Sequence, residues 1–178
     1  MNNFLPQQVF RYCPRCGSDQ FLPDSQKSMK CDKCGFQFYF NMVAAVAGLI
    51  YDQQGKLLMT YRAHDPAKGK LDLPGGFVDQ GEDAIIALRR EIMEELNLVL
   101  SHTSYYATFP NEYLYGGITY YTLDIVFNCQ VQSFEGIKPA DDVSGYTFID
   151  PFTISPDKIG LSSVRNIMNS LDEKGITK

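Results

Sequence analysis

The chain has 178 residues, of which 44% are hydrophobic, so it can bury a substantial core and is not expected to be disordered. Its 16 basic and 21 acidic residues give a net charge of −5, which argues against general affinity for nucleic acid but permits a nucleotide substrate bound through metal. The N-terminal residues lack the basic start and apolar run of a signal peptide. The longest apolar stretch, residues 42–51, is too short to span a bilayer. We therefore expect a cytoplasmic protein with no membrane partner.

Four cysteines near the N-terminus form two copies of one short motif. Two residues separate Cys13 from Cys16 and Cys31 from Cys34, and a glycine follows each pair. The 14 residues between the pairs, 17–30, have about the length of a β-hairpin. Four thiolates on two such turns suit a tetrahedral Zn²⁺ with no open coordination position, which favours a structural ion. The alternatives are two disulfides or four unligated thiols, and a reducing compartment disfavours the disulfides.

We predict a zinc ribbon over residues 1–40 and a second domain over residues 41–178. The ribbon is too small for a large core, so zinc is expected to supply much of its folding free energy. Five basic and three acidic residues lie in it without forming a basic stripe, and we interpret the ribbon as structural and not nucleic-acid-binding. An aromatic run at its end is expected to pack it onto the second domain: Phe36, Phe38, Tyr39 and Phe40.

The second domain shows strand patterns with one helix in the middle and one at the end. Strands are predicted, in chain order, over residues 42–51, 56–62, 98–100, 104–109, 119–130 and 146–149. The first helix is expected to end near Leu96, and the last to begin at Ser162 or Ser163. This order predicts a mixed sheet covered by helices.

The segment between Gly75 and Leu98 is the most informative part of the chain. Glu91, Glu94 and Glu95 fall at positions i, i+3 and i+4, so on a helix they share one face, and their mutual repulsion calls for a cation. The Pro-Gly-Gly loop upstream lets the backbone approach a ligand closely. A carboxylate cluster beside such a loop suits a hard cation such as Mg²⁺. The alternative is a solvated acidic helix face.

The same helix has an apolar side and an acidic start. Glu82 and Asp83 are expected in its first turn, where the helix dipole favours negative charge. Arg90 is expected to point away from the carboxylate face. Apolar residues at helical spacing are expected to anchor the opposite face: Ile85, Leu88, Ile92 and Leu96.

This segment resembles the Nudix box of the Nudix hydrolases. The residues that match the pattern in register are Gly76, Glu82, Arg90, Glu91, Ile92, Glu94, Glu95 and Leu98. Asn97 stands where the family has glycine, and asparagine is the non-glycine residue best suited to the left-handed conformation that ends a helix. The resemblance covers roughly residues 42–171 and implies the Nudix α/β/α sandwich with a mixed sheet, preceded here by the ribbon.

The resemblance implies metal-assisted hydrolysis of a phosphoanhydride, with Mg²⁺ or Mn²⁺ as cofactor. Glu91 and Glu95 are then the first-choice metal ligands, and Glu94 is a third ligand or the general base. The carbonyl of Gly75 is expected to join the ligands. Arg90 is similar to the family's arginine that orients a glutamate, and Glu82 is interpreted as structural.

Further candidates lie outside the box. Members of the family often take another acid from a loop, for which Asp141 and Asp142 are the candidates and Glu112 is a weaker one; a charged surface turn explains these residues equally well. Tyr113 and Tyr115 are expected either to stack on a base or to pack within the fold. The isolated basic residues and histidines are interpreted as solvated, although the basic ones could meet phosphates, and the fifth cysteine as a structural thiol: Arg62, Lys68, His64, His102 and Cys129.

A zinc ribbon followed by a Nudix domain resembles the NADH pyrophosphatase branch. The chain lacks tryptophan and therefore the Ser-Gln-Pro-Trp-Pro-Phe motif of that branch, so the preferred substrate is the broader class of nucleoside diphosphates linked to a moiety X, such as ADP-ribose or a dinucleotide like NADH. The alternatives are hydrolysis of nucleoside triphosphates or capped RNA, and a non-catalytic ligand sensor whose ribbon contacts nucleic acid or protein. The intact glutamates weigh against the sensor. A homodimer, common among relatives, is left open.

Overall fold

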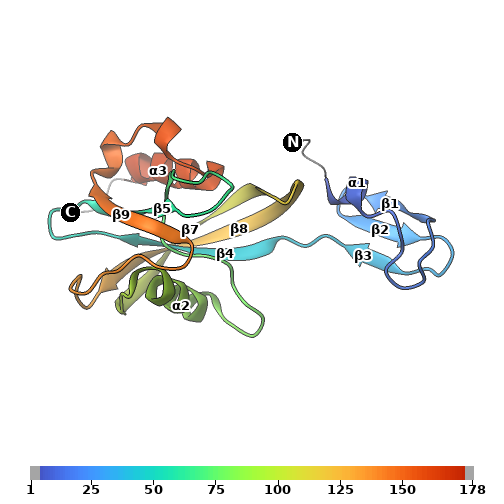
Figure 1. Ribbon diagram of the computed structural model, residues 1–178, viewed down its shortest axis with the longest axis horizontal. Helices are drawn as coiled ribbons and strands as arrows, with labels where there is room; N and C mark the ends of the chain where they lie inside the picture. The colour runs from blue at the N-terminus through green and yellow to red at the C-terminus, as the bar shows by residue number, and fades with distance from the viewer. Residues whose placement is uncertain (1–4, 175–178) are drawn as a thin grey trace. The chain divides into compact units, whose positions relative to one another are not determined.

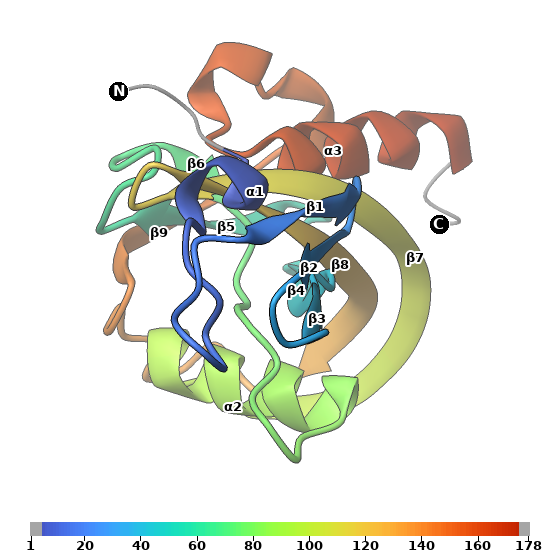
Figure 2. The same cartoon turned by 90° about the vertical axis from the view of Figure 1, so that its right-hand side faces the viewer.

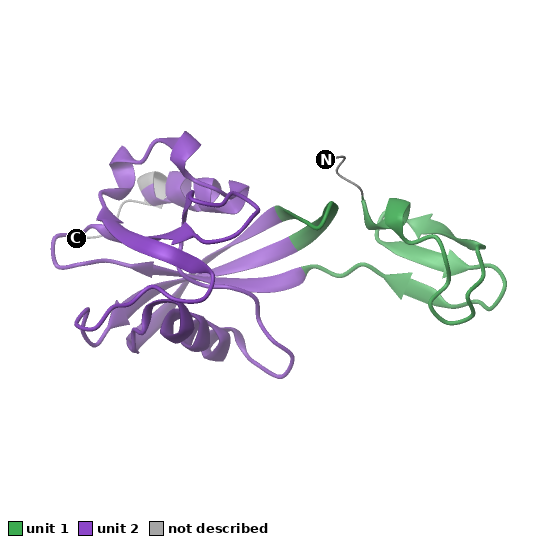
Figure 3. Ribbon diagram, in the orientation of Figure 1, with its two compact units in different colours: residues 1–42, 112–121 green, residues 43–111, 122–178 purple. Residues whose placement is uncertain are grey.

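The computed structural model describes residues 5–174, and these fall into two compact units (Figure 3). Unit 1 takes the chain up to residue 42 together with residues 112–121, and unit 2 takes residues 43–111 and those from 122 onward. The predicted domain boundary after residue 40 stays a prediction, because unit 1 also takes a piece from the middle of the chain. None of the described helices is both long enough and apolar enough to cross a bilayer.

Unit 1 contains a short helix and a small antiparallel sheet with strand order β1-β2-β3 (Figure 1). Its elements are α1 (Pro6–Val9), β1 (Phe21–Ser25), β2 (Ser28–Cys31) and β3 (Gln37–Tyr39). Two of its four buried core residues are cysteines: Cys13, Phe21, Met29 and Cys31. The predicted aromatic run packs within this unit, because Phe40 stacks on Phe10 with the ring centroids 5.6 Å apart.

Unit 2 contains two three-stranded sheets, except that residues 112–121, where two strands of one sheet meet, belong to unit 1. The first has the order β4-β8-β7 and is built from β4 (Val43–Ile50), β8 (Ile118–Val131) and β7 (Leu100–Tyr115). The second has the order β6-β5-β9 and is built from β6 (Leu71–Asp72), β5 (Leu57–Arg62) and β9 (Val143–Ile149). Strand β4 pairs with β8 in parallel, whereas β5 pairs with both of its neighbours antiparallel. The pairing is therefore mixed, as predicted.

Helices α2 (Ala84–Leu96) and α3 (Ser162–Lys174) lie on opposite sides of the strands (Figures 1 and 2). Two 3-10 turns, η1 (Pro151–Thr153) and η2 (Pro156–Lys158), precede α3. Val126 and Phe127 are neighbours on β8, yet Val126 joins the core under α3 and Phe127 the core under α2. Successive side chains of a strand point to opposite faces, so one strand serves both cores. This arrangement confirms the predicted α/β/α sandwich.

Strand β7 differs from its prediction. The sequence suggested two short strands, whereas the structure has one strand of 16 residues that runs through Pro110. Because β7 is at the edge of its sheet, a residue without an N–H is tolerated there. Gly116 and Gly117, with φ of 58° and 81°, form the two-residue turn into β8, a conformation that glycine adopts without strain.

Candidate active site

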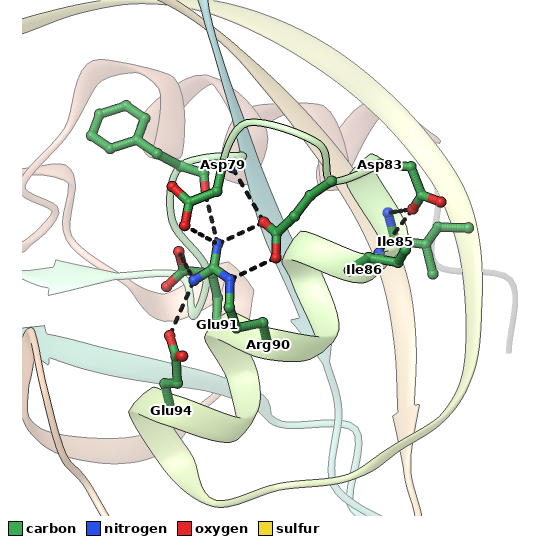
Figure 4. A network of polar contacts seen from close by, with 9 residues as sticks. Asp79, Asp83, Ile85, Ile86, Arg90, Glu91 and Glu94 are labelled. Atoms are coloured by element: carbon green, nitrogen blue, oxygen red, sulfur yellow. Dashed lines mark hydrogen bonds and ion pairs between the residues drawn. The ribbon is translucent and has the colours of Figure 1, made fainter.

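Helix α2 begins at Ala84, after both acidic residues that were expected in its first turn. Asp83 is the N-cap, and its Oδ1 accepts hydrogen bonds of 2.9 Å from the N–H groups of Ile85 and Ile86 (Figure 4). The prediction that Glu82 and Asp83 lie in the first turn is therefore wrong: a short aspartate side chain serves better as a cap, because it satisfies amides that lack helical partners. Glu82 lies before the helix.

The apolar face of α2 was predicted correctly at three of four positions. Leu88, Ile92 and Leu96 are fully buried in the core that α2 shares with the sheet. Ile85 is 42% exposed, so the prediction is wrong for this residue. It is the second residue after the cap, in the first turn, where the helix has only begun to pack.

Arg90 is the centre of the polar network on α2 (Figure 4). Its Nε and Nη2 donate to the two oxygens of Glu82 at 2.8 and 2.9 Å, a bidentate arrangement. Its Nη1 donates to Glu91 at 2.8 Å and to Glu94 at 3.0 Å. The prediction that Arg90 points away from the carboxylates is wrong, because Glu82, eight positions earlier, folds back and holds the guanidinium among them.

The same network sets the charge of Glu82. The hydrogen bond from Arg90 lowers the pKa of Glu82, and the hydrogen bonds to Glu82 raise the pKa of Arg90 further. Both groups are therefore charged, and Glu82 acts as a structural anchor, in agreement with its interpretation from the sequence. Arg90 thereby supplies one positive charge to a helix face that carries three glutamates.

Glu95 lies on the buried side of the carboxylate face. It is 6% exposed, and its Oε2 accepts a hydrogen bond of 2.9 Å from the N–H of Gly75. Burial raises the pKa of Glu95 to about 8; the Gly75 hydrogen bond opposes this shift, and negative charges including Asp72 and Glu91 add to it. Burial also raises the pKa of Glu91, against the effect of Arg90. The donors here are carboxylate oxygens with an excess of negative charge, which fits a hard divalent cation.

The Pro-Gly-Gly loop is held against β4 by its backbone. Three hydrogen bonds of 2.8 to 3.1 Å join them: Val46 N to Gly76 O, Gly48 N to Pro74 O, and Val78 N to Ala44 O. Strand β4 thus fixes the position of the loop that faces α2.

Both glycines of this loop are required, because the loop backbone approaches β4 at Gly75 and the Glu91 carboxylate at Gly76 too closely for a Cβ atom. At Gly75, with φ of 142°, a Cβ would lie 2.1 Å from the carbonyl oxygen of Val46. At Gly76 a Cβ would lie 2.5 Å from the carboxyl carbon of Glu91. A side chain at either position would displace the loop or the glutamate, so the two glycines let the backbone meet the carboxylates directly. The role of the Gly75 carbonyl as a metal ligand stays a prediction.

A distant segment brings the two candidate aspartates to the same helix. The N–H of Ala140 donates to the carbonyl oxygen of Glu95 at 2.9 Å, immediately before Asp141 and Asp142. Asp142 is among the negative charges that act on Glu95, and Asp141 among those that act on Glu91. The catalytic role of Asp142 stays a prediction.

Several other residues have surroundings that the sequence did not indicate. His64 was interpreted as a surface residue, and its side chain is 69% exposed, but its Nε2 lies 3.7 Å from Oδ1 of Asp142. Arg62 is not solvated: its Nη1 lies 2.6 Å from Oδ2 of Asp72. Sequence reasoning missed Asp72, although an acidic residue between Leu71 and Leu73, both buried here, was a usable signal. Burial raises the pKa of Asp72 in spite of Arg62.

Tyr113 and Tyr115 stack on each other with ring centroids 6.3 Å apart, within residues 112–121 of unit 1, and base stacking by them stays a prediction. Glu112 lies in the same stretch, and its role as a further acid stays a prediction. Cys129 is buried, and burial raises the pKa of its thiol to about 12, which confirms a structural thiol. His102 is exposed, as expected.

The four N-terminal cysteines form a second candidate metal site, in unit 1. Their sulfurs all lie within 4.8 Å of one another, and none of them forms a disulfide. Each knuckle is closed by a glycine N–H, from Gly17 to Cys13 O and from Gly35 to Cys31 O, at 2.8 Å. Among the residues that the structure describes, no other set of three or more His, Cys, Asp or Glu side chains gathers its ligand atoms so closely. The box carboxylates are spread wider.

Known proteins share this sequence pattern and fold. The model of the NUDIX domain family matches residues 42–162. An ADP-ribose pyrophosphatase of Methanocaldococcus jannaschii is 33% identical over 68% of this chain and 69% of its own length. The NAD-capped RNA hydrolase NudC of Vibrio cholerae is 29% identical over 58% of this chain. This chain spans only 38% of that relative's length.

Solved structures show the same likeness in fold. A crystal structure of a NUDIX hydrolase from Nitrosomonas europaea has a TM-score of 0.69 at 20% identity and covers 93% of this chain and 92% of its own. The NUDIX domain of Shewanella oneidensis NrtR, crystallised with ADP ribose, has a TM-score of 0.59 at 18% identity, over 75% of this chain and 88% of its own.

Proposed function

The chain belongs to the NUDIX domain family, and from this membership we propose that it is a metal-dependent hydrolase of a nucleoside diphosphate linked to a moiety X. In the reaction, the oxygen of a water molecule bonds to one phosphorus and the bridging oxygen leaves with the other phosphate. The water gives up a proton to a base, and the products are a nucleoside monophosphate and X-phosphate. The observation that carries the proposal is the set Glu91, Glu94 and Glu95 on one helix, with Glu95 hydrogen-bonded to the Gly75 loop.

We assign different roles to the residues of the Nudix box. Glu91, Glu95 and the carbonyl of Gly75 would hold Mg²⁺ or Mn²⁺, since carboxylate and carbonyl oxygens are suitable donors, and Glu94 would be either a third carboxylate ligand or the general base. Such an ion neutralises phosphate charge and lowers the pKa of the attacking water. Glu94 is the candidate base because its side chain is 47% exposed, against 15% for Glu91, and can therefore reach substrate. Arg90 orients both.

Asp142 adds a further acid from outside the box. It would act next to Glu95, whose backbone carbonyl binds Ala140, two residues before Asp142. We assign Asp142 a supporting role, either in adding negative charge that attracts the metal ion or in accepting a proton from the attacking water.

ADP-ribose is the preferred substrate among the nucleoside diphosphates. The relative with 33% identity, matched over two thirds of both chains, is named ADP-ribose pyrophosphatase. The NAD-capped end of an RNA is the second candidate, because several relatives, including the one from Vibrio cholerae, are named NAD-capped RNA hydrolase. ADP-ribose and the NAD-capped RNA end both contain a pyrophosphate joined to adenosine, so one site would bind this shared part of either ligand. Residues that contact the rest of each ligand would distinguish the two.

We also infer that the ion of the cysteine cluster is zinc. Four sulfurs at about 2.3 Å from a central Zn²⁺ lie about 3.8 Å apart in a regular tetrahedron. The Sγ atoms of Cys13 and Cys34, and those of Cys16 and Cys31, are 3.7 Å apart. These spacings support zinc, and thiols that remain unpaired agree with a reducing, cytoplasmic setting. Metal analysis of protein purified without chelator should give about one equivalent per chain; less than half an equivalent would contradict this.

A hydrolysis screen with Mg²⁺ tests the main proposal. It covers ADP-ribose, NADH, NAD⁺, diadenosine polyphosphates, nucleoside triphosphates and a NAD-capped RNA. We expect turnover of ADP-ribose to AMP and ribose phosphate, and a loss of roughly 10²- to 10⁴-fold in Glu94→Gln, as for removal of a general base. Asp19→Asn exchanges an exposed carboxylate in unit 1, outside the box, for an amide and should keep wild-type activity. Tight binding of one ligand with no turnover of any would support the sensor instead.

A further inference from the structure

Asn97 ends helix α2 in the left-handed conformation. Its φ and ψ are 56° and 36°, and its N–H donates to the carbonyl oxygen of Met93 at 2.9 Å. Glycine adopts this conformation without steric cost and asparagine at a small one. The backbone therefore gives no reason to prefer asparagine, and any advantage must come from its side chain.

The side chain of Asn97 makes a contact that glycine cannot make. Its Nδ2 donates to the carbonyl oxygen of Gly136 at 3.1 Å, across 39 positions of sequence. Because the acceptor is a carbonyl, only the NH₂ end of the amide can serve. An aspartate at this position, which has no donor when ionised, would also lose the bond.

This contact is the first of three that dock one segment, residues 133–142, on the end of α2. The N–H of Lys138 donates to the carbonyl oxygen of Leu96 at 3.0 Å, and that of Ala140 to the carbonyl oxygen of Glu95 at 2.9 Å. Carbonyls in the last turn of a helix have no partners within the helix, so the segment satisfies them. Helix residues 97, 96 and 95 thus meet segment residues 136, 138 and 140 in a regular ladder, which fixes the register of the segment.

The ladder ends where the two candidate acids begin. Asp141 and Asp142 follow Ala140 directly, and the carbonyl oxygen of Asp142 accepts a hydrogen bond of 2.8 Å from the N–H of Ala63. Glu95 contributes its backbone to the last contact of the ladder and its carboxylate to the box. A slip of the segment along the helix would therefore move Asp142 relative to Glu95.

We propose that Asn97 is a positioning residue: its amide holds residues 133–142 in the register that places Asp142 beside the box glutamates. The catalytic meaning of this role rests on the proposed hydrolase function, whereas the docking of the segment does not. Asn97 then has two roles: its backbone ends helix α2, and its side chain holds residues 133–142. The glycine that is usual at this position of the Nudix box has no side chain and cannot perform the second role.

Asn97→Gly separates the two tasks, because glycine keeps the helix end and removes only the amide. One hydrogen bond contributes about 1 kcal/mol, so amide hydrogen exchange at Lys138 and Ala140 should become about threefold to tenfold faster. In the Mg²⁺-dependent assay with ADP-ribose, kcat should fall by about the same factor while KM changes less than about twofold. The melting temperature should change by only a few degrees, because the lost hydrogen bond and the relieved cost of asparagine in the left-handed conformation act in opposite directions. Asn97→Asp, which keeps the size of the side chain, should reproduce the faster exchange.

A double-mutant cycle tests whether Asn97 acts through Asp142. Asp142→Asn should lower kcat in the wild type and have a smaller effect in Asn97→Gly, because the aspartate is already displaced there. Wild-type exchange at Lys138 and Ala140 in Asn97→Gly would overturn the proposal, and so would faster exchange with unchanged kcat. If the wild type hydrolyses nothing, the proposed function fails and the positioning of catalysis with it, while faster exchange in the variant would still establish the ladder.

Discussion

The cysteine cluster and the carboxylate site are assembled in opposite ways. The cluster comes from two short turns, each closed by a hydrogen bond between a glycine and a cysteine of the same knuckle, and its four sulfurs already lie within 4.8 Å of one another. The carboxylate site joins helix α2, the Pro-Gly-Gly loop on β4 and residues 133–142. Burial raises the pKa values of Glu95 and Glu91, and nearby negative charges act in the same direction, whereas Arg90 opposes the rise at Glu91.

The difference concerns what each site needs from the rest of the molecule. Local turns can form a cysteine site with little more than its ion, and the ion in turn supports the turns. The carboxylate site gathers like charges in a partly buried place, so the packed fold must hold it together against repulsion. The cysteine cluster should therefore need its metal ion in order to fold. The carboxylate site should instead need the folded domain in order to bind its metal ion.

Removal of the ion from the cysteine cluster should have the largest effect. Chelation or Cys31→Ser should unfold the ribbon, because Cys13 and Cys31 form half of its buried core and zinc supplies on the order of 10 kcal/mol in comparable sites. Hydrogen exchange of residues 13–36 should rise to unprotected rates, while unit 2 keeps its melting transition. A ribbon that stays protected without metal would contradict the comparison.

Gly75→Ala should be the most damaging change in the carboxylate site. The added Cβ would meet the carbonyl oxygen of Val46, so the free energy of unfolding should fall by about 3 kcal/mol in urea titrations, with loss of hydrolysis. Gly55→Ala is a matched control, because Gly55 also has positive φ, 77°, but open space around it. It should cost only about 1 kcal/mol, from backbone strain. Equal losses in the two variants would mean that close approach to β4 is unimportant.

Glu95 should make the metal-free protein less stable as the pH rises. Its pKa is about 8 in the folded state against an ordinary 4.5, so between these values the folded state holds more protons than the unfolded state. The free energy of unfolding of unit 2 should therefore be highest near pH 5 and fall by about 3 kcal/mol towards pH 8. Urea titrations at several pH values in chelator measure this fall. Glu95→Gln should flatten the profile, and an unchanged profile would assign the effect elsewhere.

Arg90→Lys should have the smallest effect of the four. Lysine keeps the charge but cannot make the bidentate contact with Glu82 while also reaching Glu91 and Glu94. We expect kcat to fall about tenfold, with a change in melting temperature of only a few degrees. Glu82→Gln should lower kcat in the same direction, since it loosens the same guanidinium. Full activity in both variants would show that orientation of the glutamates does not depend on Arg90.

The predictable parts of the molecule were those defined by spacing. The spacing of two residues within each cysteine pair indicated the metal cluster. The spacing of three and four positions between the glutamates indicated that they share one helix face, because helical geometry repeats at those intervals. The α/β/α architecture and the start of α3 at Ser162 also agreed with the sequence.

The unpredictable parts were contacts between elements. Glu82 reaches Arg90 because the chain before α2 folds back, which helical periodicity does not describe. Arg62 meets Asp72 because β5 and β6 pair with Thr60 opposite Asp72, and strand register cannot be read from two short patterns. The contact between Asn97 and Gly136 spans 39 positions and depends on how the segment before β9 returns to α2.

The hydrogen bonds between the Pro-Gly-Gly loop and β4 have a consequence for solubility. Strand β4 is the outer strand of the β4-β8-β7 sheet, and an outer strand with free N–H and C=O groups is a template for pairing with another chain. The loop occupies those groups at Ala44, Val46 and Gly48. Variants that dislodge it should therefore aggregate as well as lose activity, so selection for a soluble protein and for a working site acts on the same few residues.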